Sequence, residues 1–182
     1  DFDNLVKNAK EHNIDVMLDI VFNHSSINHE WFKKSYNDKI NNNQSEDSKA
    51  DWYVWSDSYK TGFHKYLNSN LYYEGNFSTD MPEFNFENTK VKEEFIKILN
   101  YWIDRGVKGF RFDAVKYFDY NNTQKNVEYL NYFKENVKDP SVYFVGEMWD
   151  NINLINDYYK SKCDSFFKFN ASLDSSKPES FL

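Results

Sequence analysis

Three apolar stretches of this sequence each end in side chains that can move a proton, attack carbon or bind an anion. They are Asp19, Asn23 and His24 after the first stretch, Arg111 and Asp113 after the second, and Glu147 after the third. In parallel sheets and barrels, catalytic groups gather at the carboxyl ends of the strands, where the connecting loops meet. If the three stretches are parallel strands of one sheet, these groups converge on one site.

Asp113 has the neighbour that a carboxylate nucleophile needs. Alternation along a strand places Arg111 and Asp113 on one face, and Phe110 and Phe112 on the other. A guanidinium close to a carboxylate favours its ionised form, which is the form that attacks carbon. Taken alone, Asp113 fits a structural ion pair at a strand end equally well.

Glu147 follows an apolar strand and Gly146, where partial burial would raise its pKa. The side chain would then hold a proton at neutral pH and act as an acid. By itself, an exposed glutamate at a strand end is the simpler interpretation. Together with Asp113, however, it makes the carboxyl pair of glycoside hydrolysis, with a separation of about 5 Å for retention and roughly 6.5 to 9.5 Å for inversion.

The elements that must position these groups alternate between helix and strand. Apolar spacing predicts a helix closed by Asn13, strands over 14–22, 107–113, 142–146 and 164–169, and helices over 90–105, 127–137 and 154–159. Such alternation is typical of parallel strands joined by crossover helices. Residues 25–87 lack clear periodicity and are predicted to form an inserted, mostly irregular subdomain between a strand and its following helix.

Composition limits the class of protein. The 182 residues are 40% hydrophobic and 28% charged, with a mean hydropathy of -0.84, which favours a globular chain. A net charge of -7 without a Lys/Arg cluster argues against nucleic acid, and no apolar run approaches the roughly 20 residues of a membrane helix. Aromatic residues make up 20% of the chain. Rings of this kind stack on sugars, although a ring-rich core explains them more simply.

Four segments resemble signature segments of the α-amylase family, glycoside hydrolase family 13. They are Asp19-Ile20-Val21-Phe22-Asn23-His24, Met81-Pro82-Glu83-Phe84-Asn85, Gly109-Phe110-Arg111-Phe112-Asp113-Ala114-Val115-Lys116 and Gly146-Glu147-Met148-Trp149. The resemblance covers nearly the whole chain and implies an α/β fold, a partial (β/α)8 TIM barrel. Residues 1–24 would supply a barrel helix and strand, 25–87 the inserted subdomain, and 88–182 further barrel helices and strands.

The same resemblance implies roles for individual residues. Asp113 would be the nucleophile, Glu147 the general acid/base, and Arg111 the side chain that orients Asp113. Four more residues would bind substrate: Asp19 by supporting the site, His24 by donating to hydroxyls of the sugar at the cleavage point, Lys116 by contacting the sugar beyond the cleaved bond, and Trp149.

Many family members also bind a structural Ca²⁺ where the inserted subdomain meets the barrel. The resemblance implies that Asn23, Glu83 and the backbone carbonyl of Tyr117 would be the ligands, and hard oxygen ligands suit calcium. Tyr117 stands where α-amylases usually have His, and Glu83 where the segment often has Asp. A carbonyl ligand tolerates the first change, whereas the longer Glu83 leaves calcium binding open.

The implied activity is hydrolysis of α-1,4-glucosidic bonds in starch-like glucans or malto-oligosaccharides by a retaining double displacement. An α-glucosidase, a glucan transferase and a non-catalytic sugar-binding remnant stay open, with Trp52, Trp55, Tyr72 and Tyr73 as candidate stacking residues. The family's third acid follows a His on a later strand, and no His follows Glu147. A full barrel takes roughly 250 residues, so we expect the remaining strands to lie outside this sequence. The compartment is open, with a secreted or cell-surface location slightly favoured.

Overall fold

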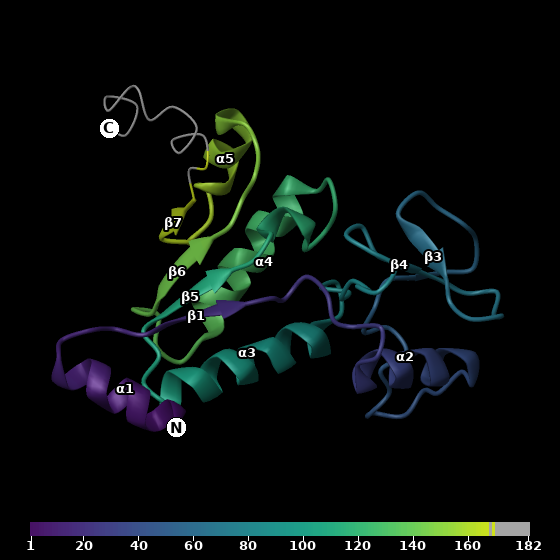
Figure 1. Cartoon of the computed structure of the whole chain (residues 1–182). Coiled ribbons are helices and arrows are strands. Elements are labelled where there is room, and N and C mark those ends of the chain that lie inside the picture. Colours follow the sequence, from purple (N-terminus) through teal and green to yellow (C-terminus); the bar gives the residue numbers. More distant parts are fainter. Residues whose placement is uncertain (168, 170–182) are drawn as a thin grey trace.

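The computed structural model describes residues 1–167 and 169. Its main part is a four-stranded parallel sheet in the order β1-β5-β6-β7. The strands are β1 (Met17–Ile20), β5 (Gly109–Phe112), β6 (Tyr143–Gly146) and β7 (Ser165–Phe166). Figure 1 shows the sheet beside helices α3 and α4, with the inserted subdomain lying to one side. The predicted parallel arrangement is therefore confirmed.

Helices join the strands as the apolar spacing predicts. They are α1 (Phe2–Glu11), α3 (Thr89–Asp104), α4 (Thr123–Asn136) and α5 (Ile152–Tyr158). The end of α3 is followed by Gly106 with φ +90°, a left-handed conformation that glycine adopts without strain. Between sheet and helices lies a core rich in rings, in which Phe110, Phe112 and Phe133 are fully buried. This core accounts for much of the high aromatic content.

The first strand is shorter and more exposed than the nine-residue buried strand that the sequence predicts. β1 has four residues, and Met17 on it is 45% exposed while Ile20 is 8% exposed. Alternation explains the contrast, because Ile20 faces the helices and Met17 the opposite side of an edge strand. The predicted last strand is also shorter, since β7 ends at Phe166. Residue 168 of the predicted strand and the polar tail 174–178 lie outside the described residues.

The inserted subdomain is more regular than predicted. It contains helix α2 (Glu30–Ile40) and a three-stranded antiparallel sheet in the order β2-β4-β3, built from β2 (Trp55–Ser56), β3 (Phe63–Lys65) and β4 (Tyr72–Glu74). The sequence pattern concealed α2 because two of its three buried residues, Ser35 and Asp38, are polar. Such a helix has no apolar periodicity to detect.

Rings build the core of the subdomain. Phe32 of α2 is fully buried and lies about 5 Å, between ring centroids, from Tyr53, Trp55 and Tyr73. Tyr73 and Trp52 are 2% and 6% exposed, so the suggestion that these two rings stack on sugar is wrong: they are core residues. Among the described residues, no helix is long and apolar enough to cross a membrane.

Candidate active site

Arg111 is the centre of the polar cluster at the carboxyl end of the sheet. Its Nη1 donates to both carboxylate oxygens of Asp19, at 2.6 and 2.8 Å, and to Asp113 Oδ1 at 3.1 Å. Its Nη2 lies 2.9 Å from Glu147 Oε2. Parallel register produces this convergence, because Asp19 pairs directly with Arg111 across β1 and β5. The three segments thus meet at one rim.

Backbone hydrogen bonds between neighbouring strands continue as far as the two acids. The amide of Asp113 donates to the Ile20 carbonyl at 3.0 Å, and the amide of Glu147 to the Phe112 carbonyl at 2.8 Å. Directly after Asp113, Ala114 adopts φ 44°, and its amide donates to Glu147 Oε2 at 3.2 Å. The sharp turn that follows β5 therefore also positions the carboxyl that follows β6.

The carboxyl groups of Asp113 and Glu147 lie against the same guanidinium, that of Arg111. Each therefore affects the pKa of the other. Burial and the neighbouring Glu147 raise the pKa of Asp113, against the opposing effect of Arg111.

The pKa shifts of the two carboxyls are opposite in direction to those predicted. Burial acts to raise the pKa of Glu147, but hydrogen bonds from Trp149, Asp113 and the Ala114 amide, together with Arg111, lower it below its usual value. Trp149 Nε1 donates to Glu147 Oε1 at 2.9 Å. The prediction failed because Glu147 receives more donors than Asp113 does, which a strand pattern does not reveal.

Three predicted substrate-binding residues lie around these acids. His24 is partly buried, its Nδ1 has no partner among the described residues, and burial lowers its pKa, which favours the neutral ring. Trp149 is 61% exposed. Lys116 Nζ donates to the Trp149 carbonyl at 2.8 Å and to Asp150 Oδ2 at 3.1 Å, so its ammonium group ties the loops after β5 and β6 together.

A cavity of about 330 Å³ opens over the acids and is lined by Phe77, Asp113, Ala114, Lys116, Tyr117, Glu147 and Trp149. Phe77 comes from the inserted subdomain and was missed by the sequence analysis, because a lone ring in an irregular segment carries no pattern. It is 43% exposed, and its centroid lies 4.3 Å from that of Tyr117 and 5.5 Å from that of His24. The subdomain thus contributes a wall to the cavity.

The predicted calcium ligands lie where the subdomain joins the sheet. Asn23 is fully buried, and both polar atoms of its side chain lack partners within the described residues. The Phe84 amide donates to the Asn23 carbonyl at 3.1 Å, which brings Glu83 close. Glu83 is 3% exposed, and its two carboxylate oxygens accept from the Asn76 amide and side chain at 2.8 and 2.9 Å. No three acidic, His or Cys side chains in residues 1–167 and 169 form a metal-binding group.

Comparison with known proteins matches residues 1–180 to the family model of the α-amylase catalytic domain. The chain belongs to the α-amylase family. One relative, Alpha-amylase 3 of Dictyoglomus thermophilum, is 40% identical in an alignment that covers 91% of this chain and 33% of that protein. A probable alpha-glucosidase of Rhizobium meliloti is 35% identical in an alignment that covers 65% of this chain and 23% of that protein.

Solved structures of the family agree with the fold. Eubacterium rectale Amy13B superimposes with a TM-score of 0.87 at 36% identity, covering 93% of this chain and 34% of that one. The chain therefore spans between about a quarter and a third of the length of these relatives. As a member of the family it has the TIM-barrel fold, of which the four parallel strands are a part.

Proposed function

We propose that the protein carrying this chain hydrolyses α-1,4-glucosidic bonds of malto-oligosaccharides or starch-like glucans with retention of configuration. The supporting observation is the pair of carboxyl groups, Asp113 and Glu147, held by Arg111 at the mouth of the sheet. Retention is the outcome expected when one carboxylate of such a pair attacks the anomeric carbon directly.

In the first step, a carboxylate oxygen of Asp113 bonds to the anomeric carbon while the glycosidic C–O bond breaks. Glu147 donates its proton to the departing oxygen. In the second step, Glu147 takes a proton from water, the water oxygen bonds to the anomeric carbon, and Asp113 leaves. In the substrate-free structure, hydrogen bonds and Arg111 lower the pKa of Glu147, so bound substrate must change these surroundings before Glu147 holds the proton that it donates.

Steady-state assays of the full-length protein on maltoheptaose test this proposal. Asp113→Asn and Glu147→Gln should each abolish turnover by removing a group that forms or breaks a bond, and the first product observed by NMR should be the α anomer. Asp104→Asn is the matched control, since this exposed carboxylate ends α3 at the opposite end of the sheet. A wild-type protein that binds glucan but does not turn it over would instead support a sugar-binding remnant.

An α-glucosidase is the second candidate, because the Rhizobium meliloti relative carries that description. The two activities differ in where they cut. An endo-acting enzyme releases a range of short products from maltoheptaose, whereas an α-glucosidase releases glucose from the chain end. A time course of the product sizes separates them.

We also propose that the protein binds a structural Ca²⁺ through Asn23, Glu83 and the Tyr117 carbonyl. The buried side-chain oxygen of Asn23, which has no partner among the described residues, and the buried carboxyl of Glu83 on the adjoining segment support this proposal. Bound calcium would hold the subdomain against the barrel. At a hundredfold excess over its Kd it should stabilise the protein by about 2.7 kcal/mol in thermal unfolding. Equal melting temperatures with calcium and with a chelator would reject the site.

A further inference from the structure

A loop of the inserted subdomain, residues 75–81, carries Phe77 to the wall of the catalytic cavity. The loop begins directly after β4 and ends shortly before Glu83, which pairs with His24 in an isolated antiparallel bridge. At the middle of the loop, the Phe77 ring contacts the rings of His24 and Tyr117, which belong to the barrel. The position of this loop therefore decides where one wall of the cavity stands.

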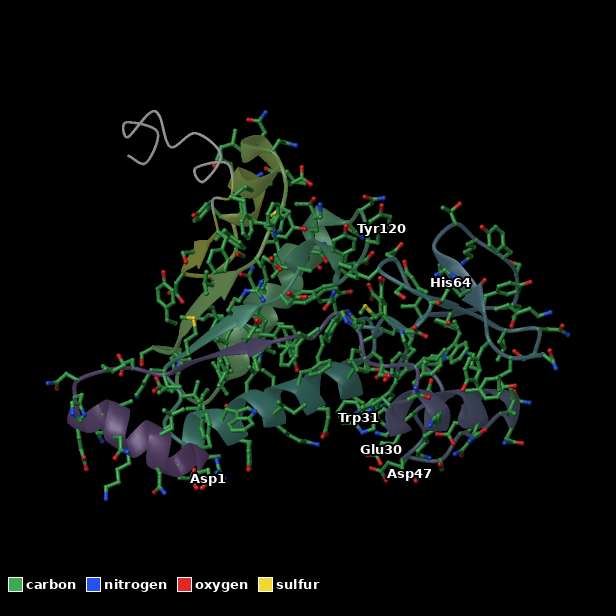
Figure 2. All side chains as sticks on the ribbon, viewed as in Figure 1. Asp1, Glu30, Trp31, Asp47, His64 and Tyr120 are labelled. Carbon is green, nitrogen blue, oxygen red and sulfur yellow. The ribbon has the colours of Figure 1, made fainter. Side chains whose placement is uncertain are left out.

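The backbone before Phe77 is held at Gly75. The Gly75 amide donates to the Gly62 carbonyl at 2.9 Å, and Nε2 of His64 donates to the Gly75 carbonyl at 2.9 Å. His64, which is labelled in Figure 2, lies on β3. A side-chain carbon at Gly75 would lie 2.9 Å from the Ser78 carbonyl oxygen and 3.1 Å from the His64 ring, so the loop packs here as closely as glycine allows. The first half of the loop is thus anchored to β3.

The backbone after Phe77 is held at Thr79 and Asp80. The Tyr73 hydroxyl donates to the Thr79 carbonyl at 2.5 Å, and the Ile27 amide donates to the Asp80 carbonyl at 2.8 Å. Tyr73 is 2% exposed, and its ring belongs to the core of the subdomain. Its hydroxyl therefore anchors the second half of the loop from a fixed position.

The two side chains that anchor the loop are neighbours. His64 and Tyr73 stand opposite each other in the antiparallel register of β3 and β4, with ring centroids 5.8 Å apart. Side chains that are paired in this way lie on the same face of a sheet. One cross-strand pair thus reaches the loop on both sides of Phe77. A cavity wall that is fixed before substrate arrives reduces the cost of binding.

We propose that Tyr73 and His64 are positioning residues for the catalytic cavity, because their hydrogen bonds to the loop keep the Phe77 ring against His24 and Tyr117. The inference rests on the proposed function and assigns to two side chains of the subdomain an effect on substrate affinity. Neither side chain is among those that line the cavity, so their effect must pass through the loop.

The first test is Tyr73→Phe in the full-length protein, which removes the hydroxyl and keeps the buried ring. Thr79 is exposed, so water can bond to the carbonyl that loses its partner, and the fold should survive. KM for maltoheptaose should rise roughly twofold to tenfold, the range that corresponds to one hydrogen bond, with kcat unchanged. The matched control is Tyr129→Phe: Tyr129 is 5% exposed and donates to Glu87 at 3.1 Å, so its KM should stay at the wild-type value.

A double-mutant cycle shows whether Tyr73 acts through Phe77. Phe77→Ala removes the ring that the loop positions, so adding Tyr73→Phe to this variant should raise KM no further. A second pair of variants examines the other anchor. His64→Leu should raise KM as Tyr73→Phe does, whereas His64→Gln keeps a side-chain N–H donor and should stay closer to the wild-type KM.

An additive rise of KM in the double variant, or no rise in Tyr73→Phe, would overturn the inference. If the wild type turns over no glucan, the proposed function fails, and hydrogen exchange of the backbone amides in residues 75–81 decides the inference separately. Faster exchange there in Tyr73→Phe than in both the wild type and Tyr129→Phe then supports the anchoring of the loop. Equal exchange in the three proteins rejects it.

Discussion

Two acidic clusters of this molecule differ in how the negative charge of their carboxylates is compensated. The rim cluster consists of Asp19, Asp113 and Glu147 around Arg111. The junction cluster consists of Glu74, Glu83 and Asp119, which line a cavity of about 150 Å³ between subdomain and barrel. Comparing them shows how a guanidinium and a neutral amide differ as partners of neighbouring carboxylates.

Asn76 occupies the central place in the junction cluster that Arg111 occupies at the rim. Its side-chain amide donates to Glu74 and Glu83 at 3.0 and 2.9 Å, and its backbone amide to Glu83 at 2.8 Å. Within residues 1–167 and 169, neither glutamate forms an ion pair with Lys or Arg. Burial raises the pKa of both, that of Glu83 to about 7. Neutral donors satisfy the hydrogen bonds but leave the charge uncompensated.

Replacing the cation of the rim cluster should have the largest effect. In the full-length protein, Arg111→Met leaves three carboxylates facing one another, and we expect kcat to fall roughly 10²- to 10³-fold, as for loss of one preorganised donor. Arg105→Met is the control, because Arg105 pairs with Asp3 between α1 and α3, away from the rim. Wild-type turnover by Arg111→Met would show that the guanidinium does not organise the acids.

The junction cluster should make stability depend on pH. Between the usual pKa of 4.5 and about 7, native Glu83 holds a proton that the unfolded chain has released. Stability therefore falls as pH rises through this window, by about 3 kcal/mol, and the loss is complete above pH 7. Chemical unfolding in the presence of a chelator measures the slope.

Glu83→Gln should flatten that slope, since it removes the titrating group. The control is Glu87→Gln: a hydrogen bond from Lys125 lowers the pKa of Glu87, so its loss should leave the slope between pH 5 and 7 intact. An unchanged slope in Glu83→Gln would mean that the carboxyl titrates normally, and the contrast between the clusters would disappear.

Replacing Asn76, the neutral donor of the junction cluster, should have a smaller effect than replacing Arg111. Asn76→Ala deletes two side-chain donors from buried carboxyls, and we expect about 2 kcal/mol of destabilisation in thermal unfolding. The comparison variant, Asn41→Ala, deletes an exposed side-chain bond to the Asn37 carbonyl at the end of α2 and should be nearly neutral. Similar losses for both variants would show that Asn76 has no special role.

The smallest effect should come from Lys125, a cation whose partner Glu87 lines the same cavity as the junction cluster. Lys125 pairs with Glu87 at 2.6 Å on the partly exposed side of this region. Lys125→Met should change the unfolding free energy by about 1 kcal/mol or less, as surface ion pairs usually do. A much larger loss would indicate that Lys125 supplies the compensating charge that the junction otherwise lacks.

The sequence predicted the parts of this molecule that depend on local pattern. Alternation in the strand from Gly109 placed Arg111 and Asp113 on one face, and the structure shows them in contact. The alternation of strand and helix predicted the parallel sheet, and Gly106 marked the end of α3. These features follow from residues a few positions apart, whose geometry the backbone itself fixes.

Tertiary structure alone decided the rest. Glu147 and Asp113 lie 34 positions apart, so their common pairing with Arg111 and the directions of their pKa shifts depend on the register between β5 and β6. Phe77 reaches the catalytic cavity only because the subdomain folds back on the sheet. Helix α2 escaped detection because its buried face is largely polar. Burial, charge compensation and cavity walls are set by distant neighbours, and no short stretch of sequence contains them.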